Sequence, residues 1–314
     1  MLLKRSPNPK PLGVPLDDLE KAIGHTSLKA TRDGNSLIVQ NGHLITRVEV
    51  VAPTKRECGD ATIEAVVQIK TELPQEIVAG FRLSPQLAGT FNAMATLGAL
   101  TIEKDRYFIG SRLTIYEQEN AWSVHFGLLL FAIIGAADSF LGAARRVFTK
   151  EEPLREASAW TEEDLSLVES YLSRQCLCTT GDLSLTAEFS LRGGEVSATF
   201  EDHRTALWRI FADQPHPELG GGLFCLLELP HRIADQSRLD AILIQLNQME
   251  MAASDLPPHF GAWCQGNLDN NPAYVSFYPN VVHDIGGIAL NASMWALPRA
   301  EWADAALVSL GVRL

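Results

Sequence analysis

Apolar and polar residues alternate most regularly at residues 183–191, where leucine, alanine and phenylalanine occupy the odd positions. Because successive side chains of a strand point to opposite faces, this pattern predicts a β-strand with one apolar and one polar face. Gly193 and Gly194 separate it from a second β-rich run at residues 195–200. We therefore predict a hairpin whose apolar face is covered by a helix or by a second sheet.

Another hairpin is predicted in the first half of the chain. Residues 36–51 form two β-rich runs on either side of Asn41 and Gly42. An Asn-Gly pair favours the two-residue hairpin turn, because both of its residues tolerate the positive φ that this turn needs. We take the two hairpins as matching landmarks of an internal repeat.

A strand that ends in the same three residues follows each hairpin. Residues 62–74 and 222–230 both finish with Glu-Leu-Pro. Proline ends a strand because it cannot donate a backbone hydrogen bond. A helix is expected next, with Asn92 in the first half and Asn247 in the second. The asparagine lies 18 residues after the proline in one half and 17 in the other, which supports a repeat.

The remaining elements also occur in pairs. Helices are expected at residues 15–23 and 161–172, hairpins at 99–117 and 261–278, and closing helices at 122–148 and 288–310. The order α-β-β-β-α-β-β-α has runs of strands, which predicts an α+β fold with antiparallel sheets. We predict a flexible N-terminal tail at residues 1–11 and tandem duplicated modules at 12–150 and 158–314, packed together as an intramolecular pseudo-dimer.

This order of elements, with Phe-Asn-Ala-Met at residues 91–94 and Leu-Asn-Gln-Met at 246–249, resembles the type III secretion chaperone-like fold. That fold includes Tir-chaperone-like domains and bacterial sensory-transduction-regulator-type domains. The resemblance covers most of the chain as two tandem copies. It implies a chaperone-like or regulatory protein that holds an extended polypeptide without cofactor or catalysis. The chain departs from the family in its double length, its neutral first half and its very apolar residues 126–137.

The composition is that of a globular protein, and the charge limits its partners. Lys and Arg total 26 against 38 Asp and Glu, and this net charge of −12 disfavours nucleic acid as a partner. Through residue 156 there are 18 basic and 18 acidic residues, whereas residues 157–314 have 8 and 20. The acidic second half has two interpretations that stay open: a solvated surface, or a field that attracts a basic partner segment.

No membrane span and no secretory signal are predicted. Residues 126–137 are twelve uncharged residues, against the about twenty of a spanning helix, so a buried or partner-facing helix is expected. Five cysteines without a Cys-x-x-Cys pattern favour free thiols in a reducing compartment, and the tail has no apolar signal region. We therefore predict a cytoplasmic protein, either monomeric or weakly homodimeric.

Catalytic and metal-binding patterns are weak. The eight histidines have no spacing that places two ligands on one side of an element. Residues 220–222, Gly-Gly-Gly, lack the Lys-Ser/Thr of a nucleotide loop. Ser111 and Cys264 have no nucleophile-elbow sequence around them. We therefore expect no enzyme activity, no cofactor and no metal site.

Aromatic residues of the last hairpin are the candidate partner-binding residues. Trp263, Tyr274 and Tyr278 lie on its strands, and Tyr116 lies on the corresponding hairpin of the first half. Two alternatives stay open: an exposed aromatic platform for a peptide, or a strand buried on both sides where the modules meet. For the asparagines of the central helices, the alternatives are ligand binding and a bond that ties the helix to a neighbouring loop.

The leading hypothesis is a non-enzymatic protein that holds a polypeptide partner, for which a basic segment is the favoured kind. It binds either by strand addition at a sheet edge or in an apolar groove between the modules. One alternative is an enzyme with a site where the modules meet, which paired carboxylates or a histidine beside Cys264 in a pocket would favour. Another is a structural scaffold or an immunity-type partner of a toxin, whose binding high salt would weaken.

Overall fold

The structure, a computed structural model, describes most of the chain. The described residues are 16–52, 57–58, 61–75, 85–93, 97–117, 122–145, 161–163, 166, 170, 184–190, 193–199, 204–212, 216, 222–267, 270–279 and 285–312. Within them the chain forms five helices and two antiparallel sheets, which confirms the predicted α+β class. The predicted tail at residues 1–11 lies outside the described residues, as does most of the helix predicted at 161–172.

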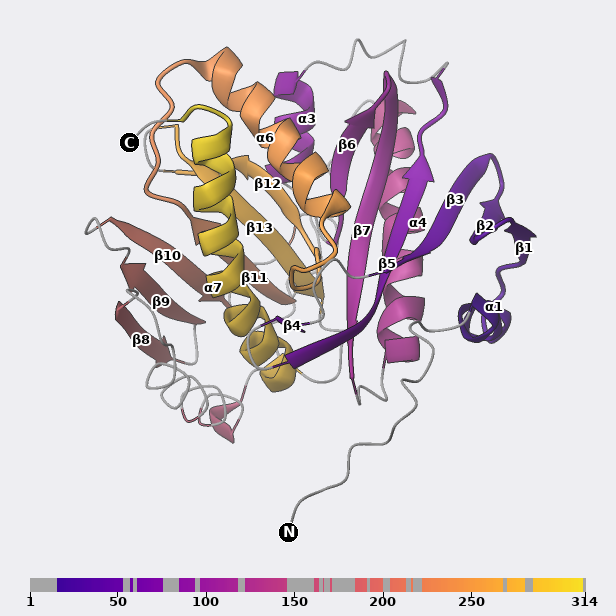
Figure 1. The fold of residues 1–314 in the computed structure, drawn as a ribbon, viewed down its shortest axis with the longest axis horizontal. Helices are drawn as coiled ribbons and strands as arrows, with labels where there is room; N and C mark the ends of the chain where they lie inside the picture. The colour runs from indigo at the N-terminus through magenta and orange to yellow at the C-terminus, as the bar shows by residue number, and fades with distance from the viewer. Residues whose placement is uncertain are drawn as a thin grey trace.

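The first half of the chain forms an antiparallel sheet of seven strands (Figure 1). The strands are β1 (Ala30–Asp33), β2 (Ser36–Asn41), β3 (Leu44–Val51), β4 (Glu57–Cys58), β5 (Ala61–Glu72), β6 (Ala99–Glu103) and β7 (Arg106–Tyr116). They lie side by side in the order β1-β2-β3-β5-β7-β6, and the short β4 pairs with β5. The hairpin between β2 and β3 is present as predicted, but its turn lies one residue later. Asn41 pairs with Leu44 as the last residue of β2, so the two turn residues are Gly42, which has a positive φ, and His43.

The second half forms an antiparallel sheet of six strands. The strands are β8 (Ser184–Ser190), β9 (Gly193–Thr199), β10 (Thr205–Phe211), β11 (Gly222–Glu228), β12 (Ala262–Gln265) and β13 (Pro272–Pro279). Their order across the sheet is β12-β13-β11-β10-β9-β8. Edge strand β12 pairs with the last strand of the chain, β13, as the edge strand β6 pairs with β7 in the first sheet.

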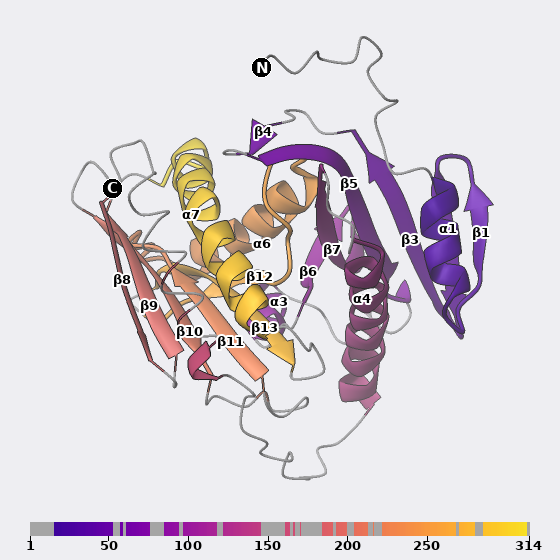
Figure 2. The same ribbon diagram turned by 90° about the horizontal axis from the view of Figure 1, so that it is seen from below.

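One face of each sheet is covered by a long helix (Figure 2). The helices are α1 (Leu16–Gly24), α3 (Pro85–Ala93), α4 (Trp122–Arg145), α6 (Gln236–Ala252) and α7 (Ile285–Ser309). Helix α4 packs on β3, β5 and β7, and α7 packs on β10 and β11. Helices α3 and α6 each connect the fourth strand of a sheet to its edge strand, so the two halves have the same order of elements from α3 and α6 onward.

The predicted unit had one strand too few in each half. In the structure, four strands of the path through each sheet precede the central helix, whereas three were predicted. The strands that were not predicted are β1 and β10. Strand β1 is largely exposed and has no apolar alternation, whereas β10 alternates regularly between buried and partly exposed residues and could have been recognised. The turn at Gly42 therefore joins the second and third strands, and the hairpin before Gly193 joins the first and second, so these two landmarks do not correspond.

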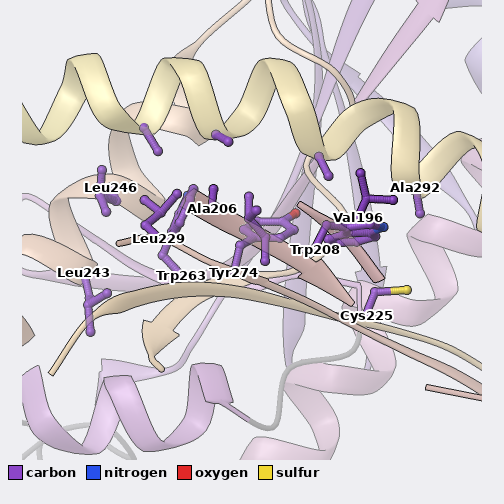
Figure 3. Packing of buried hydrophobic residues seen from close by; sticks show 14 of the residues in the cluster. Val196, Ala206, Trp208, Cys225, Leu229, Leu243, Leu246, Trp263, Tyr274 and Ala292 are labelled. Atoms are coloured by element: carbon purple, nitrogen blue, oxygen red, sulfur yellow. The ribbon is translucent and has the colours of Figure 1, made fainter. Parts of the chain in front are cut away.

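Helix α7 lies close to the second sheet because most of the residues on its inner face are alanines. The buried alanines of this face are Ala289, Ala292, Ala296, Ala300, Ala303 and Ala306. Small side chains leave room for the large ones opposite, among them Trp208, Trp263 and Tyr274 (Figure 3). The Trp208 indole N–H donates to Ser293 Oγ at 2.9 Å, so this polar atom is satisfied inside the core.

Helix α4 buries the apolar stretch that the sequence singled out. Phe126, Leu130 and Ile133 are buried against the first sheet, whereas Phe131 on the other side of the helix is 45% exposed. The expectation of a buried helix is therefore confirmed for its inner face. Among the described residues, no helix is long and apolar enough to cross a membrane.

Candidate functional site

The two halves meet at a seam, formed by α3 and β6 of the first half and α6 and β12 of the second (Figure 1). Helix α3 packs against α6 and β12, and α6 packs against β6, so each half contributes the same pair of elements. Ala99 of β6 and Ala262 of β12 are fully buried against each other. Reciprocal contacts of this kind characterise an isologous interface.

An asparagine ties each central helix to its edge strand. In the first half, the Asn92 side chain accepts a hydrogen bond from Leu100 N at 2.8 Å and donates to Leu100 O at 3.3 Å. In the second half, Asn247 accepts from Trp263 N at 2.8 Å and donates to Trp263 O at 2.9 Å. The amides therefore tie the helix to its neighbour as expected, but the neighbour is an edge strand rather than a loop. Both atoms of each amide are thus engaged within the protein.

A glycine precedes the buried alanine of each edge strand. A Cβ atom on Gly98 would lie 2.9 Å from the backbone oxygen of Gly110 on the paired strand. A Cβ atom on Gly261 would overlap the backbone oxygen of Val275 in the same way. The close approach of the two strands therefore requires glycine at both positions.

Beside the seam, a carboxylate is buried with three donors. Glu250 of α6 accepts a hydrogen bond from Arg299 Nε of α7 at 2.8 Å and from the Trp263 indole N–H at 2.6 Å. The same Oε1 atom that binds Arg299 lies 3.2 Å from His259 Nδ1. The Arg299 guanidinium also lies over the Tyr274 ring, 4.1 Å from its centroid. All five side chains are buried.

A fully buried arginine of the first half completes this group, which we call the seam cluster: Arg112, Glu250, His259, Trp263, Tyr274 and Arg299. Arg112 of β7 donates from Nη1 to the carbonyl oxygens of Glu250 and Ala253, at 2.5 and 2.6 Å, and from Nη2 to that of Pro257. Its backbone pairs with His259, whose N–H donates to Arg112 O at 2.8 Å.

The last two residues of α6 and the connection after them are held on the first sheet, and we call residues 251–259 the clamp segment. The side chains of Gln68, Thr114 and Ser111 donate to the carbonyl oxygens of Met251, Leu256 and His259, at 3.1, 2.8 and 2.5 Å. Gln68 lies on β5, whereas Ser111, Thr114 and Arg112 lie on β7. The clamp segment therefore joins the halves through backbone carbonyls that would otherwise be buried without a partner.

Burial and charge shift the titratable groups of the seam cluster in different directions. Burial raises the pKa of Glu250, but Arg299 and then His259 outweigh it and hold the pKa well below its usual value. Burial lowers the pKa of Arg112 to about 10 and also lowers the pKa of His259, although Glu250 opposes both shifts. Glu250 outweighs burial at Arg299 and raises its pKa. At neutral pH the cluster thus holds one carboxylate, two guanidinium groups and a neutral imidazole.

The candidate nucleophiles are not activated. Burial raises the pKa of the Cys264 thiol to about 12, so this thiol is protonated at neutral pH. Ser111 donates its hydroxyl proton to the carbonyl oxygen of His259, which is not a base. In the part of the chain that the structure describes, no group of three or more His, Cys, Asp or Glu side chains could hold a metal ion.

The candidate partner-binding aromatics lie inside the molecule or at its margin. Trp263, Tyr274 and Tyr278 are 0%, 2% and 8% exposed, and Tyr116 is partly buried at the end of β7. Of the two alternatives for the last hairpin, the structure shows the buried strand. Trp263 and Tyr274 pack edge to face, with ring centroids 5.4 Å apart.

The charged residues of the seam cluster were missed by the sequence analysis. Glu250 lies between two methionines, and Arg299 follows Pro298 in an alanine-rich stretch. A lone charge in such surroundings is a signal of a buried polar contact, because an unpaired buried charge is costly. The partners could not be identified, since Arg112 is 138 residues from Glu250.

On the face of the second sheet that points away from α7, two partly buried phenylalanines form what we call the β10–β11 patch: Phe211 of β10 and Phe224 of β11, packed on the buried Leu226 and Val275. Phe211 and Phe224 are opposite in register, with ring centroids 5.9 Å apart. Arg209 lies between Leu207 and Phe211 on β10, and it donates to Glu195 at 2.6 Å and to Glu228. The patch is thus bordered by paired charges.

The first sheet has a polar pair at the corresponding place. Gln68 lies four residues before the end of β5, as Phe224 lies four residues before the end of β11. The register partner of Gln68 on β3 is Glu49. Gln68 is buried and donates to the clamp segment, which covers this place. The second sheet has two partly exposed phenylalanines there instead.

No family model, no curated protein and no solved structure matches the chain. The case for its function therefore depends on its own geometry. The relevant features are two sheets with one strand order, a reciprocal seam, and an apolar patch bordered by ion pairs.

Proposed function

We propose that the chain is a non-enzymatic protein of two tandem copies of one module, packed as an intramolecular pseudo-dimer, that binds a polypeptide partner. The observation that carries this proposal is the reciprocal seam. Helix α3 contacts β12 as α6 contacts β6. In addition, α3 contacts α6, and the edge strand β6 contacts the edge strand β12. A two-fold dimer of one module has this pattern of contacts.

Matching registers support the duplication. The strands that end in Glu-Leu-Pro make the same bond after their last residue: Leu73 N donates to Tyr107 O at 2.9 Å, and Leu229 N donates to Pro272 O at 3.0 Å. Each acceptor precedes the residue opposite the final glutamate of its strand. The asparagine bonds and the edge-strand glycines agree with the same alignment. Independent agreement at so many positions favours two copies over two unrelated α+β halves.

The state of the polar groups supports a non-catalytic role. The side chains that chemistry could use at the seam are buried and bonded to one another, as in Glu250 with Arg299 and Trp263. The buried thiols of Cys225 and Cys264 are free, which supports a reducing compartment such as the cytoplasm. The seam cluster is best explained as the joint between the two modules.

The β10–β11 patch is the surface that we assign to the partner. Its counterpart on the first sheet is covered by the clamp segment from the other half, where Gln68 donates to the carbonyl oxygen of Met251 at the end of α6. By analogy, we assign the partly exposed patch on the second sheet to a segment of another polypeptide. Its favoured chemistry is an apolar stretch next to basic residues, because residues 157–314 have 8 basic and 20 acidic residues. The aromatic pair supplies contact area at a low cost in side-chain entropy.

Affinity capture with a matched pair of variants tests the proposal. Tagged wild-type protein, the double variant Phe211→Ser with Phe224→Ser, and Phe131→Ser on the far helix α4 are used to capture partners from native lysate. Each captured partner is then purified and titrated against the three proteins. We expect one polypeptide whose affinity falls by about tenfold or more in the double variant and is unchanged in Phe131→Ser.

Two outcomes would contradict the proposal. One is that no captured polypeptide binds the purified wild-type protein. The other is that a polypeptide binds the double variant as tightly as wild type while circular dichroism shows that both proteins are folded. Titration at low and high salt separates apolar packing from the purely electrostatic binding expected of an immunity-type protein, which high salt abolishes.

A further inference from the structure

His259 has an unusual place in the clamp segment. Its backbone is bound to the first sheet, where its N–H donates to Arg112 O and its carbonyl accepts from Ser111 Oγ. Its side chain is fully buried in the seam cluster. Among the described residues, Nε2 of this imidazole has no hydrogen-bond partner. His259 thus holds the two halves together through its backbone, and its imidazole can take up a proton.

Several charged or titratable groups face this imidazole. Glu250 of α6 lies 3.2 Å from Nδ1, and the hydroxyl of Tyr274 on β13 lies 3.4 Å from the same atom. Arg299 of α7 and Arg112 of β7 both oppose a positive charge on His259. Because Nδ1 faces a carboxylate, it holds the proton of the neutral imidazole and donates it to Glu250.

A second proton on the imidazole is poorly tolerated at this place. It binds at Nε2 and creates a buried N–H donor without an acceptor among the described residues. It also adds a third positive charge to a cluster with one carboxylate, which already accepts a hydrogen bond from Arg299 and lies near the guanidinium of Arg112. Water does not reach the side chain, so it cannot compensate the added charge. The imidazolium therefore becomes stable only when His259 leaves the cluster.

We propose that the clamp segment is an acid-released joint: protonation of His259 draws it out of the seam cluster and detaches residues 251–259 from β7. The detachment follows because the backbone of the same residue is bonded to Arg112 and Ser111. Mild acid thereby loosens the contact between the two halves while the core of each sheet stays folded.

The direction of the pH effect follows from linkage. The pKa of His259 in the folded protein lies below its usual value of 6.5 because of burial. The clamp is therefore fully stable above about pH 6.5 and loses stability as the pH falls towards the folded-state pKa. Within that interval the opening equilibrium of the segment shifts by about tenfold for each pH unit.

Hydrogen exchange with mass spectrometry measures this opening on the full chain. Wild type, His259→Asn, His231→Asn and His43→Asn are compared at pH 7.5 and 5.0, with labelling times scaled for the intrinsic exchange rates. Asparagine at position 259 places an amide N–H where Nδ1 lies but cannot take up a proton. His231 is a second buried histidine, and His43 is exposed.

We expect wild type, His231→Asn and His43→Asn to lose protection at pH 5.0 in peptides that cover residues 253–262 and 108–114. Protection in β10 and β11 is retained, and His259→Asn shows no acid-dependent loss. Unchanged protection of residues 253–262 in wild type at pH 5.0 overturns the proposal, whether or not the variant folds. It is also overturned if His259→Asn loses protection as wild type does, or if His231→Asn removes the effect.

Discussion

Replacing Glu250 with glutamine tests the role of the seam cluster in holding the halves together. The carboxylate accepts from Arg299 and Trp263 and faces His259, and it is the one anion of the cluster. Glutamine keeps the size of the side chain and removes its charge. Both guanidinium groups, those of Arg299 and Arg112, then stay buried without an anion.

Burial of the partners sets the size of the effect. Glu250 is 0% exposed and Arg299 is 3% exposed, so water cannot replace the lost charge. Breaking a buried pair of this kind costs about 3–5 kcal/mol, compared with a total stability of about 5–15 kcal/mol for a typical protein. The ion pair between Arg209 and Glu195 is the control, because it is partly exposed and such surface pairs contribute about 0–1 kcal/mol.

Urea unfolding at pH 7.5, followed by tryptophan fluorescence, gives the free energy of unfolding of each variant. We expect Glu250→Gln to lower it by about 3 kcal/mol or more and Glu195→Gln by less than about 1 kcal/mol. The double replacement Glu250→Met with Arg299→Met is expected to cost less than Glu250→Gln, because it leaves one unpaired guanidinium instead of two.

The reasoning is refuted if Glu250→Gln and Glu195→Gln lower the free energy of unfolding by the same small amount. That result would mean that the guanidinium groups of Arg299 and Arg112 reach water when Glu250 loses its charge. If the double replacement costs more than Glu250→Gln, packing of the two side chains matters more than the pairing of their charges.

Three further predictions concern the seam and its neighbours. Asn92→Leu and Asn247→Leu each leave a buried backbone N–H and C=O unpaired. Each is therefore expected to lower the free energy of unfolding, measured in urea titrations, by about 2–4 kcal/mol. A loss of under about 1 kcal/mol would contradict the hydrogen bonds of these two asparagines. Gly261→Ala is expected to lower the thermal midpoint of unfolding because its Cβ overlaps a neighbouring strand. Gly89→Ala in α3, where a Cβ has open space, is expected to raise the midpoint because alanine restricts the unfolded chain more than glycine does. Equal shifts of the two midpoints would contradict this. Cys264 is 1% exposed and has a pKa of about 12, so we expect it to react with a thiol reagent at pH 8 only after urea is added. Mass mapping that finds the label on Cys264 of the native protein would contradict this.

Local signals in the sequence were sufficient to locate most elements. The Glu-Leu-Pro strand ends and the apolar residues of α4 each depend on short-range chemistry, and the structure has them where they were predicted. The hairpin at Gly42 was also located, although its turn residues are Gly42 and His43 rather than Asn41 and Gly42. Strand β1 was missed because its four residues are mostly exposed and its pairing with β2, rather than its own pattern, makes it a strand. Such an edge strand has no periodicity to detect.

The seam cluster could not be predicted, for a different reason. Its charges come from β7, α6, the clamp segment and α7, and no local pattern links Arg112 to Glu250 or Glu250 to Arg299. The sequence did indicate that the last hairpin was either exposed or buried at the meeting of the halves. Only the three-dimensional arrangement decides between these, because the apolar residues of β13 occupy both of its faces.

A disulfide across the seam tests the two-module account most directly. Ala99 of β6 and Ala262 of β12 are buried against each other, so we expect cysteines at both positions to form a disulfide. After mild oxidation of the variant Ala99→Cys with Ala262→Cys, peptide mapping by mass spectrometry identifies the bonded pair. The account predicts a bond between positions 99 and 262 within one chain, and free thiols at both positions, or a bond formed only between two chains, would contradict it.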